Sequence, residues 1–349
     1  MSRQTFQVEI ADMGSFRARA GETLLDAALM SGVDMPHDCR SGTCGSCRCT
    51  VSSGSVEGGA TDSPGDVLAC QAKVMSDLQI VVEETPPVES FSATVKAIRD
   101  LSVDVAKVSL AVKGPFEMLP GQYVQVRFAG FPARCYSPSA PLEGPLERGV
   151  IRLQIKRVRN GRVSSALGRE IQPGHKVKVI GPYGSAWLRP GQTNRLVLVA
   201  SGAGFAPIWS IAHAALCEMP DREIVVVVGA NSVSDFYMAP ALWRLVAFPK
   251  TQVISVLRNA DRRHPDLPVG SPVDHLPALR PGDIVYACGA PRMVEAVGAV
   301  ARAAGAACYA DPFVPGHGSA AGFWEPFARA VAAPLQMLRR SGARASTTA

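Results

Sequence analysis

The sequence contains no apolar run long enough to cross a bilayer as a helix, which takes roughly 20 consecutive apolar residues. Its longest apolar run, Ile224–Ala230, is interrupted by Gly229 and has the length of a strand. The first residues, MSRQTFQVEIADMG, hold no apolar core of the kind that a secretory signal requires. These absences predict a cytoplasmic protein with no membrane span.

Aromatic and charged residues are also scarce, at 6% and 19% of the 349 residues. The low charge excludes a disordered polyelectrolyte, and basic residues without interleaved aromatics give no sign of nucleic-acid binding. Residues 1–85 hold 12 acidic and 6 basic side chains, whereas the rest of the chain holds 18 and 30. This asymmetry favours docking of the two parts on each other, or of the acidic part on a basic partner, unless it serves solubility alone.

A disulfide framework and an acid–base dyad are missing as well. The nine cysteines are odd in number, and the chain shows no secretion signal, so a set of structural disulfides is not expected. The six histidines share no motif. No general acid–base dyad is therefore expected.

Five of the nine cysteines lie between positions 39 and 70. Four of them have the spacing C-x4-C-x2-C followed, after 22 residues, by a last cysteine; these are Cys39, Cys44, Cys47 and Cys70. The spacing is typical of plant-type 2Fe-2S ferredoxins, in which two irons take four thiolates. Zinc is the alternative, but zinc sites usually carry two C-x2-C pairs and this segment has one. Cys49 is expected to be a buried thiol at the start of a strand, not a ligand.

The segments around these cysteines resemble the β-grasp fold of plant-type ferredoxins. We expect a helix with Thr23 as its N-cap and Gly32 just past its end. Strands are expected at Phe6–Ile10, Ser15–Ala18, Thr50–Ser52 and Leu78–Val82. Two prolines in residues 83–89 then indicate an extended linker.

Beyond the linker, short strand-like runs separated by turns predict an antiparallel barrel. They are Phe91–Arg99, Val105–Val112, Gln122–Phe128, Val150–Val158 and Lys176–Ile180. Arg134-Cys-Tyr136-Ser137 lies among them, and this R-x-Y-S motif resembles the ferredoxin–NADP reductase-like flavoprotein family. The resemblance implies that Arg134 binds the flavin phosphates, Tyr136 covers the ring and Ser137 reaches the reactive ring nitrogen.

Other barrel segments resemble the same family. Asn160–Ser165 reads as a glycine turn that leads into a helix N-terminus, which would make a second phosphate element. The resemblance implies cofactor contacts from that element and from the preceding strand; the residues are Gly161, Val163 and Ser164, with Gln154, Ile155 and Lys156 lining the flavin.

From Asn194 onward, apolar runs alternate with helical segments, which predicts a doubly wound parallel sheet. The first run is followed by G-x-G-x-x-P, in which Gly202, Gly204 and Pro207 would admit a pyrophosphate close to backbone N–H groups. Cys288-Gly289-Ala-Pro291-Arg-Met293 resembles the family element beside the nicotinamide. Tyr309-Ala-Asp-Pro-Phe313 resembles the stretch where the family's domain ends, and it would place Phe313 near the flavin ring. These resemblances make Ser137, Cys288 and Phe313 the expected catalytic residues.

No lysine or arginine occurs from 229 to 243, where a 2′-phosphate would need one, so NADH is favoured over NADPH. Asp235 is the candidate partner for a ribose 2′-hydroxyl.

Taken together, the three parts resemble the reductase components of multicomponent aromatic-ring-hydroxylating oxygenases, those of naphthalene dioxygenase type in particular. The expected fold is an α+β multidomain chain: a β-grasp ferredoxin (1–88), an antiparallel β-barrel FAD domain (89–192) and an α/β doubly wound NAD domain (193–313). Residues 314–349 are expected to be a partly disordered tail, with a basic helix that docks a partner or a membrane surface as the alternative. No function is assigned to the tail.

The resemblance implies an oxidoreductase in which NADH reduces FAD, FAD reduces a 2Fe-2S cluster, and the cluster reduces a terminal oxygenase or its separate ferredoxin. Two alternatives stay open. One is the reductase of a di-iron monooxygenase of the phenol or methane hydroxylase type, and the other is a flavin and iron–sulfur redox sensor.

Overall fold

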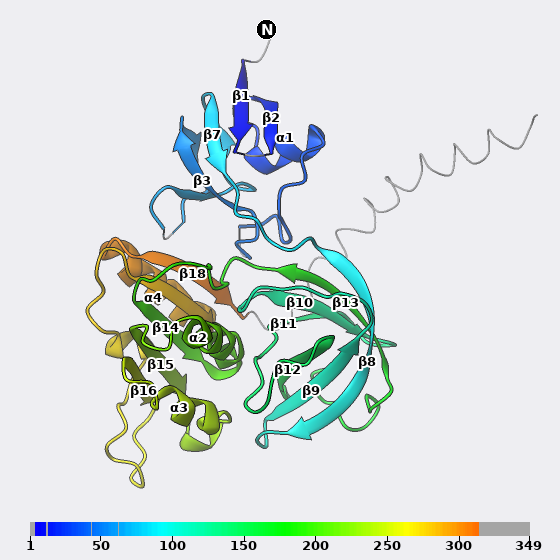
Figure 1. Ribbon diagram of the computed structural model, residues 1–349, viewed down its shortest axis with the longest axis vertical. Helices are drawn as coiled ribbons and strands as arrows, with labels where there is room; N and C mark the ends of the chain where they lie inside the picture. Colours follow the sequence, from blue (N-terminus) through cyan, green and yellow to red (C-terminus); the bar gives the residue numbers. More distant parts are fainter. Residues whose placement is uncertain (1–3, 12, 43, 62, 314–349) are drawn as a thin grey trace, which may run out of the picture.

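The computed structural model describes residues 4–11, 13–42, 44–61 and 63–313, which form three units (Figure 1). The predicted fold class is confirmed: a β-grasp unit, an antiparallel barrel and a doubly wound parallel sheet follow one another along the chain. Within these described ranges, no helix has both the length and the apolar character that a membrane crossing demands. The predicted tail, 314–349, lies outside the described residues.

The N-terminal unit is a five-stranded sheet of order β2-β1-β7-β3-β5 with one helix against it. Thr23 caps the helix as predicted, since its hydroxyl accepts from the Asp26 N–H at 3.3 Å, and Gly32 just past the end has φ +80°. The elements are β1 (Thr5–Ile10), β2 (Gly14–Arg19), α1 (Leu24–Met30), β3 (Arg48–Ser53), β4 (Val56–Glu57), β5 (Asp66–Leu68), β6 (Lys73–Val74) and β7 (Leu78–Val81).

The second unit is a six-stranded antiparallel sheet of order β11-β10-β13-β8-β9-β12. An isolated bridge between Pro138 and Leu153 joins the segment after β11 to β12, so the sheet nearly closes into the predicted barrel. The strands are β8 (Glu89–Asp100), β9 (Val105–Val112), β10 (Tyr123–Phe128), β11 (Arg134–Tyr136), β12 (Val150–Lys156) and β13 (Lys176–Tyr183).

The prediction of a helix that begins near Gly161 is wrong. Residues 159–170 form successive turns, and no helix runs from Gly161 to Ser165. Ser165 N–H donates to the Gly161 carbonyl, but Ala166 N–H already turns back to Val163, and Gly168 has φ +81°. A left-handed glycine so soon after the turn ends any helix before it can propagate.

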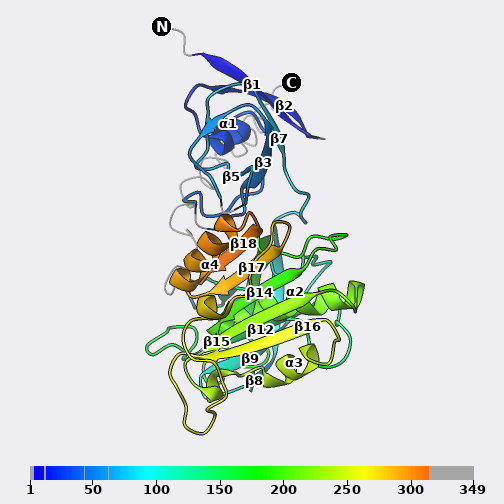
Figure 2. The same cartoon turned by 90° about the vertical axis from the view of Figure 1, so that its left-hand side faces the viewer.

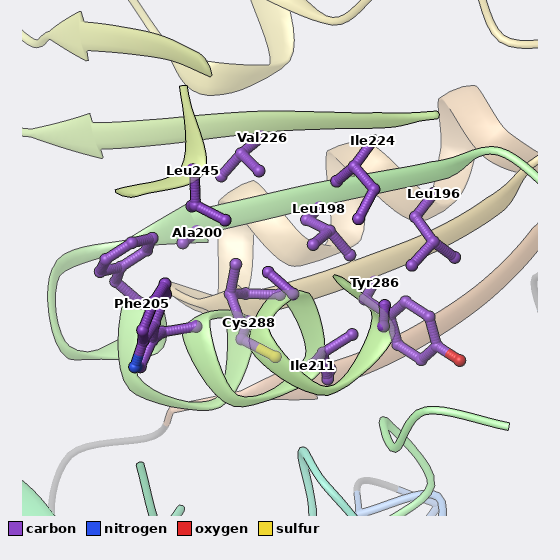
Figure 3. Close-up of a cluster of buried hydrophobic side chains, with 14 of the residues drawn as sticks. Leu196, Leu198, Ala200, Phe205, Ile211, Ile224, Val226, Leu245, Tyr286 and Cys288 are labelled. Atoms are coloured by element: carbon purple, nitrogen blue, oxygen red, sulfur yellow. The ribbon is translucent and has the colours of Figure 1, made fainter. Parts of the chain in front are cut away.

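The third unit is a five-stranded parallel sheet of order β16-β15-β14-β17-β18. Alternate residues of its strands point to opposite faces. One buried cluster packs around α2 and α3 (Figure 3). Another packs around α4 on the opposite face, which is the doubly wound arrangement. The elements are β14 (Leu196–Ser201), η1 (Gly202–Gly204), α2 (Phe205–Glu218), β15 (Ile224–Ala230), η2 (Val233–Asp235), α3 (Ala239–Leu245), β16 (Thr251–Leu257), η3 (Pro272–His275), β17 (Ile284–Gly289), α4 (Pro291–Ala303) and β18 (Ala307–Pro312).

The β-grasp unit sits at one end of the molecule, above β18 and the barrel, and the other two units lie side by side (Figures 1 and 2). Barrel residues such as Ala186 and Leu188 pack into the same buried cluster as Ile211 of α2. Two units thus share a core, and the third is placed against both.

Candidate functional site

The four predicted cluster cysteines come together at the end of the β-grasp unit that faces the barrel. Backbone N–H groups point at their sulfurs: Ser41 N lies 3.4 Å and Cys44 N 3.3 Å from Cys39 Sγ, and Ser46 N lies 3.5 Å from Cys44 Sγ. Such donors stabilise thiolates over thiols. Cys70 reaches the group from after β5, with the Gln71 side-chain amide 3.7 Å from its sulfur.

The thiols are arranged as two pairs. A hydrogen bond from Cys44 lowers the pKa of Cys39, and one from Cys47 lowers the pKa of Cys70. Among the described residues, no group of three Cys, His, Asp or Glu side chains is placed to bind a single metal ion. A 2Fe-2S cluster does not need three ligands around one ion, because its two irons each take two thiolates. The donor set therefore fits this cluster better than a single ion such as zinc.

Cys49 lies in β3 and is 3% exposed, as predicted for a packing residue. Burial raises the pKa of its thiol to about 12, so it stays protonated.

The R-x-Y-S motif forms β11, where Tyr136 pairs with Val124 of β10. Burial raises the pKa of Tyr136 above its usual range. The Arg134 guanidinium donates to the Ala133 carbonyl at 2.8 Å. The motif thus offers a cation and an aromatic ring from one short strand.

Ser137 ends this motif and meets Asp311, a residue that sequence reasoning did not assign. Its hydroxyl donates to Asp311 Oδ2 at 3.4 Å. Burial raises the pKa of Asp311 to about 7. Cys288 pairs with Asp311 between β17 and β18 and is fully buried, which raises the pKa of its thiol. The expected catalytic residues Ser137 and Cys288 therefore flank one half-buried carboxyl. Its position two residues after Tyr309 in a recognised motif was the available signal.

Phe313, the third expected catalytic residue, follows β18. Its backbone N–H donates to the Gly289 carbonyl at 2.7 Å, which ties the end of the described chain to the turn after β17. Its place near a flavin ring stays a prediction.

The remaining flavin-lining candidates are distributed over β12 and the turns after it. Gln154 is 8% exposed; its amide donates to Ser139 Oγ at 2.9 Å and accepts from the Tyr237 hydroxyl at 2.9 Å. The Ser164 hydroxyl accepts from Val158 N–H at 3.1 Å, and a Cβ on Gly161 would lie 2.5 Å from that oxygen. Ile155 and Val163 are buried, whereas Lys156 is exposed.

The glycine turn after β14 packs against the end of β17. A Cβ on Gly204 would lie 2.1 Å from the Cys288 carbonyl oxygen, and one on Gly289 would lie 2.5 Å from Ser201. This is where the strand order reverses, since β14 has β15 on one side and β17 on the other. Open α/β sheets bind ligands at such a point. Pro207 is buried within α2, and Pro291 and Met293 lie in the first turn of α4.

A pocket opens beside the same turn. Its lining includes Gly202, Gly229, Asp235 and Tyr237. The Asp235 carboxylate accepts from Ser232 N–H at 3.0 Å, which fixes it at the pocket wall. The residues that the sequence linked to the nucleotide thus lie together.

Three families match consecutive parts of the chain. The 2Fe-2S iron-sulfur cluster binding domain matches residues 10–75, the oxidoreductase FAD-binding domain 92–187 and the oxidoreductase NAD-binding domain 198–299. The naphthalene 1,2-dioxygenase system ferredoxin–NAD(P)(+) reductase component of Pseudomonas putida is 32% identical over 85% of this chain and 95% of its own. The chain belongs to the family of ferredoxin–NAD(P)(+) reductase components of oxygenase systems. The predicted 2Fe-2S, FAD and NAD domains and the oxidoreductase class are confirmed.

Other members work in different systems. The alkene monooxygenase system ferredoxin–NAD(+) reductase component of Xanthobacter autotrophicus is 36% identical over 69% of this chain and 77% of its own. A solved Amycolatopsis cytochrome P450 reductase is 30% identical, with a TM-score of 0.63 over 89% of this chain and 99% of that one. The module order is thus compatible with several terminal acceptors.

Proposed function

We propose that this chain is the NADH-dependent reductase of an aromatic-ring dioxygenase system, and that it reduces a terminal oxygenase or its separate ferredoxin. The observation that carries the proposal is the cysteine loop of the ferredoxin domain placed directly on the barrel, with Gly184 N–H donating to Ser46 Oγ at 3.0 Å. When bound, FAD accepts a hydride from NADH and a 2Fe-2S cluster accepts single electrons, so the pair converts a two-electron donor into a one-electron supply.

The residues that would hold each group follow from the geometry. Cys39, Cys44, Cys47 and Cys70 would hold the two irons of the cluster. Arg134, Tyr136 and Ser137 would hold FAD, and the turn from Gly202 to Gly204 would hold the pyrophosphate of the nucleotide. Ser137, Asp311 and Cys288 then form a buried polar site at the boundary of the two binding domains. We assign residues 1–88, 89–192 and 193–313 to the ferredoxin, FAD and NAD domains.

NADH is the proposed donor because Asp235 lines the pocket and neither lysine nor arginine occurs from 229 to 243. A cytoplasmic location is proposed because none of the nine cysteines forms a disulfide, as is usual in reducing compartments. Neither proposal depends on the identity of the acceptor.

The test is purification, followed by an absorbance spectrum and anaerobic titration with NADH. A flavin and a 2Fe-2S spectrum, both bleached by NADH, are expected. The purified protein, mixed with NADH and a ring-hydroxylating dioxygenase, should then support formation of the hydroxylated product. A parallel assay replaces the dioxygenase with the hydroxylase of a di-iron monooxygenase. Fast NADH oxidation with an artificial acceptor would exclude a sensor, and turnover only with the monooxygenase would overturn the dioxygenase assignment.

A further inference from the structure

The ferredoxin domain is attached to the rest of the protein without a shared core. Its buried cluster draws on its own residues alone, from Phe6 to Val82 among those that the structure describes. Interfaces of this kind leave domains free to move relative to one another unless specific contacts hold them. The docked position of the ferredoxin domain therefore depends on individual polar contacts.

One group of contacts covers the free edge of β18, the last strand of the parallel sheet. The neighbouring Ala307 N–H donates inward, to the Asp283 carbonyl at the start of β17. The Cys308 N–H, one residue later, points the other way and donates to Ser63 Oγ of the ferredoxin domain at 2.9 Å. An exposed strand edge presents unpaired N–H and C=O groups, and here another domain satisfies them.

Ser63 uses its full hydrogen-bonding capacity at this place. A hydroxyl donates once and accepts twice. Ser63 Oγ accepts from Cys308 N–H and, at 3.1 Å, from Arg48 Nη1, and it donates to the Cys308 carbonyl at 3.2 Å. Arg48 Nη2 donates to that same carbonyl at 3.1 Å. Removing the Ser63 hydroxyl would leave two buried donors without this acceptor.

Aromatic contacts extend the same interface. The Arg48 guanidinium lies 4.7 Å from the centre of the Tyr309 ring, and that of Arg189 lies 3.5 Å from it. Arg189 also pairs with Glu83 of the linker through two bonds, of 2.9 Å and 2.5 Å. Tyr309 thus contacts one cation from the ferredoxin domain, Arg48, and one from the segment after the barrel strands, Arg189. We call Ser63, Arg48, Cys308 and Tyr309 the β18 contact.

A second group of contacts holds the cysteine loop on the barrel. The Tyr123 hydroxyl donates to Asp38 Oδ2 at 2.5 Å, and Gly184 N–H donates to Ser46 Oγ at 3.0 Å. The surfaces are close, since a Cβ on Gly45 would lie 2.3 Å from Ser185 Oγ. We call these the loop contact. It shares no residue with the β18 contact.

We propose that Ser63, Arg48 and Tyr309 are positioning residues for electron transfer: they dock the ferredoxin domain on the free edge of β18 and thereby hold the cysteine loop against the barrel. The two contacts form and break as one unit, because one rigid domain carries the ferredoxin half of both. This inference rests on the proposed function only for its kinetic consequence. The docking itself can be measured without turnover.

Backbone amide exchange in the full-length protein, loaded with FAD and iron–sulfur cluster, tests the docking in both directions. Ser63→Ala breaks the β18 contact, and we expect the distant Gly184 amide to exchange about tenfold faster, which corresponds to ~1.4 kcal/mol. Tyr123→Phe removes the bond to Asp38, one of the two hydrogen bonds of the loop contact, and the Cys308 amide should respond in the same direction. Ser52→Ala, an exposed serine on β3, is the matched control and should change neither amide.

Stopped-flow absorbance supplies the second readout. In Ser63→Ala, NADH should reduce the flavin at the wild-type rate, whereas the following reduction of the cluster should slow severalfold, with the cluster spectrum and potential unchanged. Arg48→Lys should be intermediate, because lysine keeps the charge opposite Asp66 but loses the fork on Cys308 and Ser63. Tyr309→Phe should behave as wild type, because the ring is retained.

Exchange at Gly184 that is unchanged in Ser63→Ala, together with an unchanged cluster-reduction rate, would overturn the inference. A wild-type protein whose cluster is never reduced by NADH would instead overturn the proposed function. In that case the exchange results would still decide whether the two contacts act as one unit.

Discussion

Ser137 and Asp311 meet across the boundary between the barrel and the parallel sheet, with the serine hydroxyl 3.4 Å from Asp311 Oδ2. Ser137 is 5% exposed, and burial raises the pKa of Asp311 to about 7 from 3.8. In the folded protein Asp311 therefore keeps its proton over a range in which the unfolded chain has lost it. Its contribution to stability is complete below pH 3.8 and is lost as the pH rises through about 7.

Asp311→Asn, which mimics the protonated carboxyl, should remove this dependence. Between about pH 4 and about pH 7, the interval between the unfolded and folded pKa values of Asp311, wild type should lose stability relative to the variant, by up to ~4 kcal/mol for about three pKa units. Thermal unfolding followed by circular dichroism across this range measures the difference. A difference between the two proteins that stays constant with pH would contradict the assignment. Asp266→Asn, at an exposed aspartate, controls for general charge effects.

Cys44→Ser should abolish reduction of the acceptor protein and leave NADH-dependent dye reduction at the flavin. Ser is a poor replacement for a thiolate ligand, and the flavin precedes the cluster in the proposed order. Cys49→Ala is the matched control, because Cys49 is a buried thiol in the same segment and should leave the iron–sulfur absorbance intact. Loss of flavin reduction in a folded Cys44→Ser protein would show that the order is wrong.

Gly204→Ala should impair the nucleotide site far more than Gly202→Ala does. A Cβ at 204 would lie 2.1 Å from the Cys288 carbonyl oxygen, a backbone atom that cannot move aside. A Cβ at 202 meets nothing within 4 Å, although φ is +53°, so Gly202→Ala pays only backbone strain of about 1–2 kcal/mol. Thermal midpoints and the KM for NADH compare the two, and equal effects would argue against close packing of this turn on β17.

The contrast between local and long-range features explains what the sequence could predict. The strand Val105–Val112 and the cap at Thr23 were predictable because hydrophobic alternation and capping chemistry are properties of a few adjacent residues. β11 was not, since Arg134–Tyr136 is a three-residue strand without an apolar pattern. The prediction of a helix after Gly161 was wrong because Gly168, which adopts a left-handed conformation, interrupts the segment after the turn.

The pairings that build the site were beyond any local pattern. Ser63 and Cys308 are 245 residues apart, and Ser137 and Asp311 are 174 apart. Neither pair has a spacing rule, because each joins two different units of the fold. Docking of the two parts was one of the interpretations that the charge asymmetry left open, and among the described residues one ion pair, Glu83 with Arg189, fits it.

Acceptor reduction should slow as ionic strength rises. Residues 1–85 hold 12 acidic and 6 basic side chains. This net negative charge would steer a basic external partner through long-range attraction, which salt screens over about 10 Å at 0.1 M. Steady-state reduction of the acceptor at increasing salt measures this, with dye reduction at the flavin as the control. A rate indifferent to salt would remove electrostatic steering from the account.

Asp235→Asn should weaken the preference for NADH over NADPH. The carboxylate stands at the wall of the pocket beside Gly202, so it can accept from a ribose 2′-hydroxyl and repel a 2′-phosphate. Loss of one hydrogen bond should lower kcat/KM for NADH about fivefold, and relief of repulsion should raise kcat/KM for NADPH. The ratio of kcat/KM for NADH to that for NADPH should therefore fall by more than tenfold. Ser232→Ala keeps the Asp235 carboxylate and removes the Ser232 hydroxyl, which donates to Asp235 Oδ2 at 3.1 Å. The NADH-to-NADPH ratio of kcat/KM should therefore change less in this variant. Equal ratios in Asp235→Asn and wild type would mean that nucleotide choice is made by residues outside 229–243.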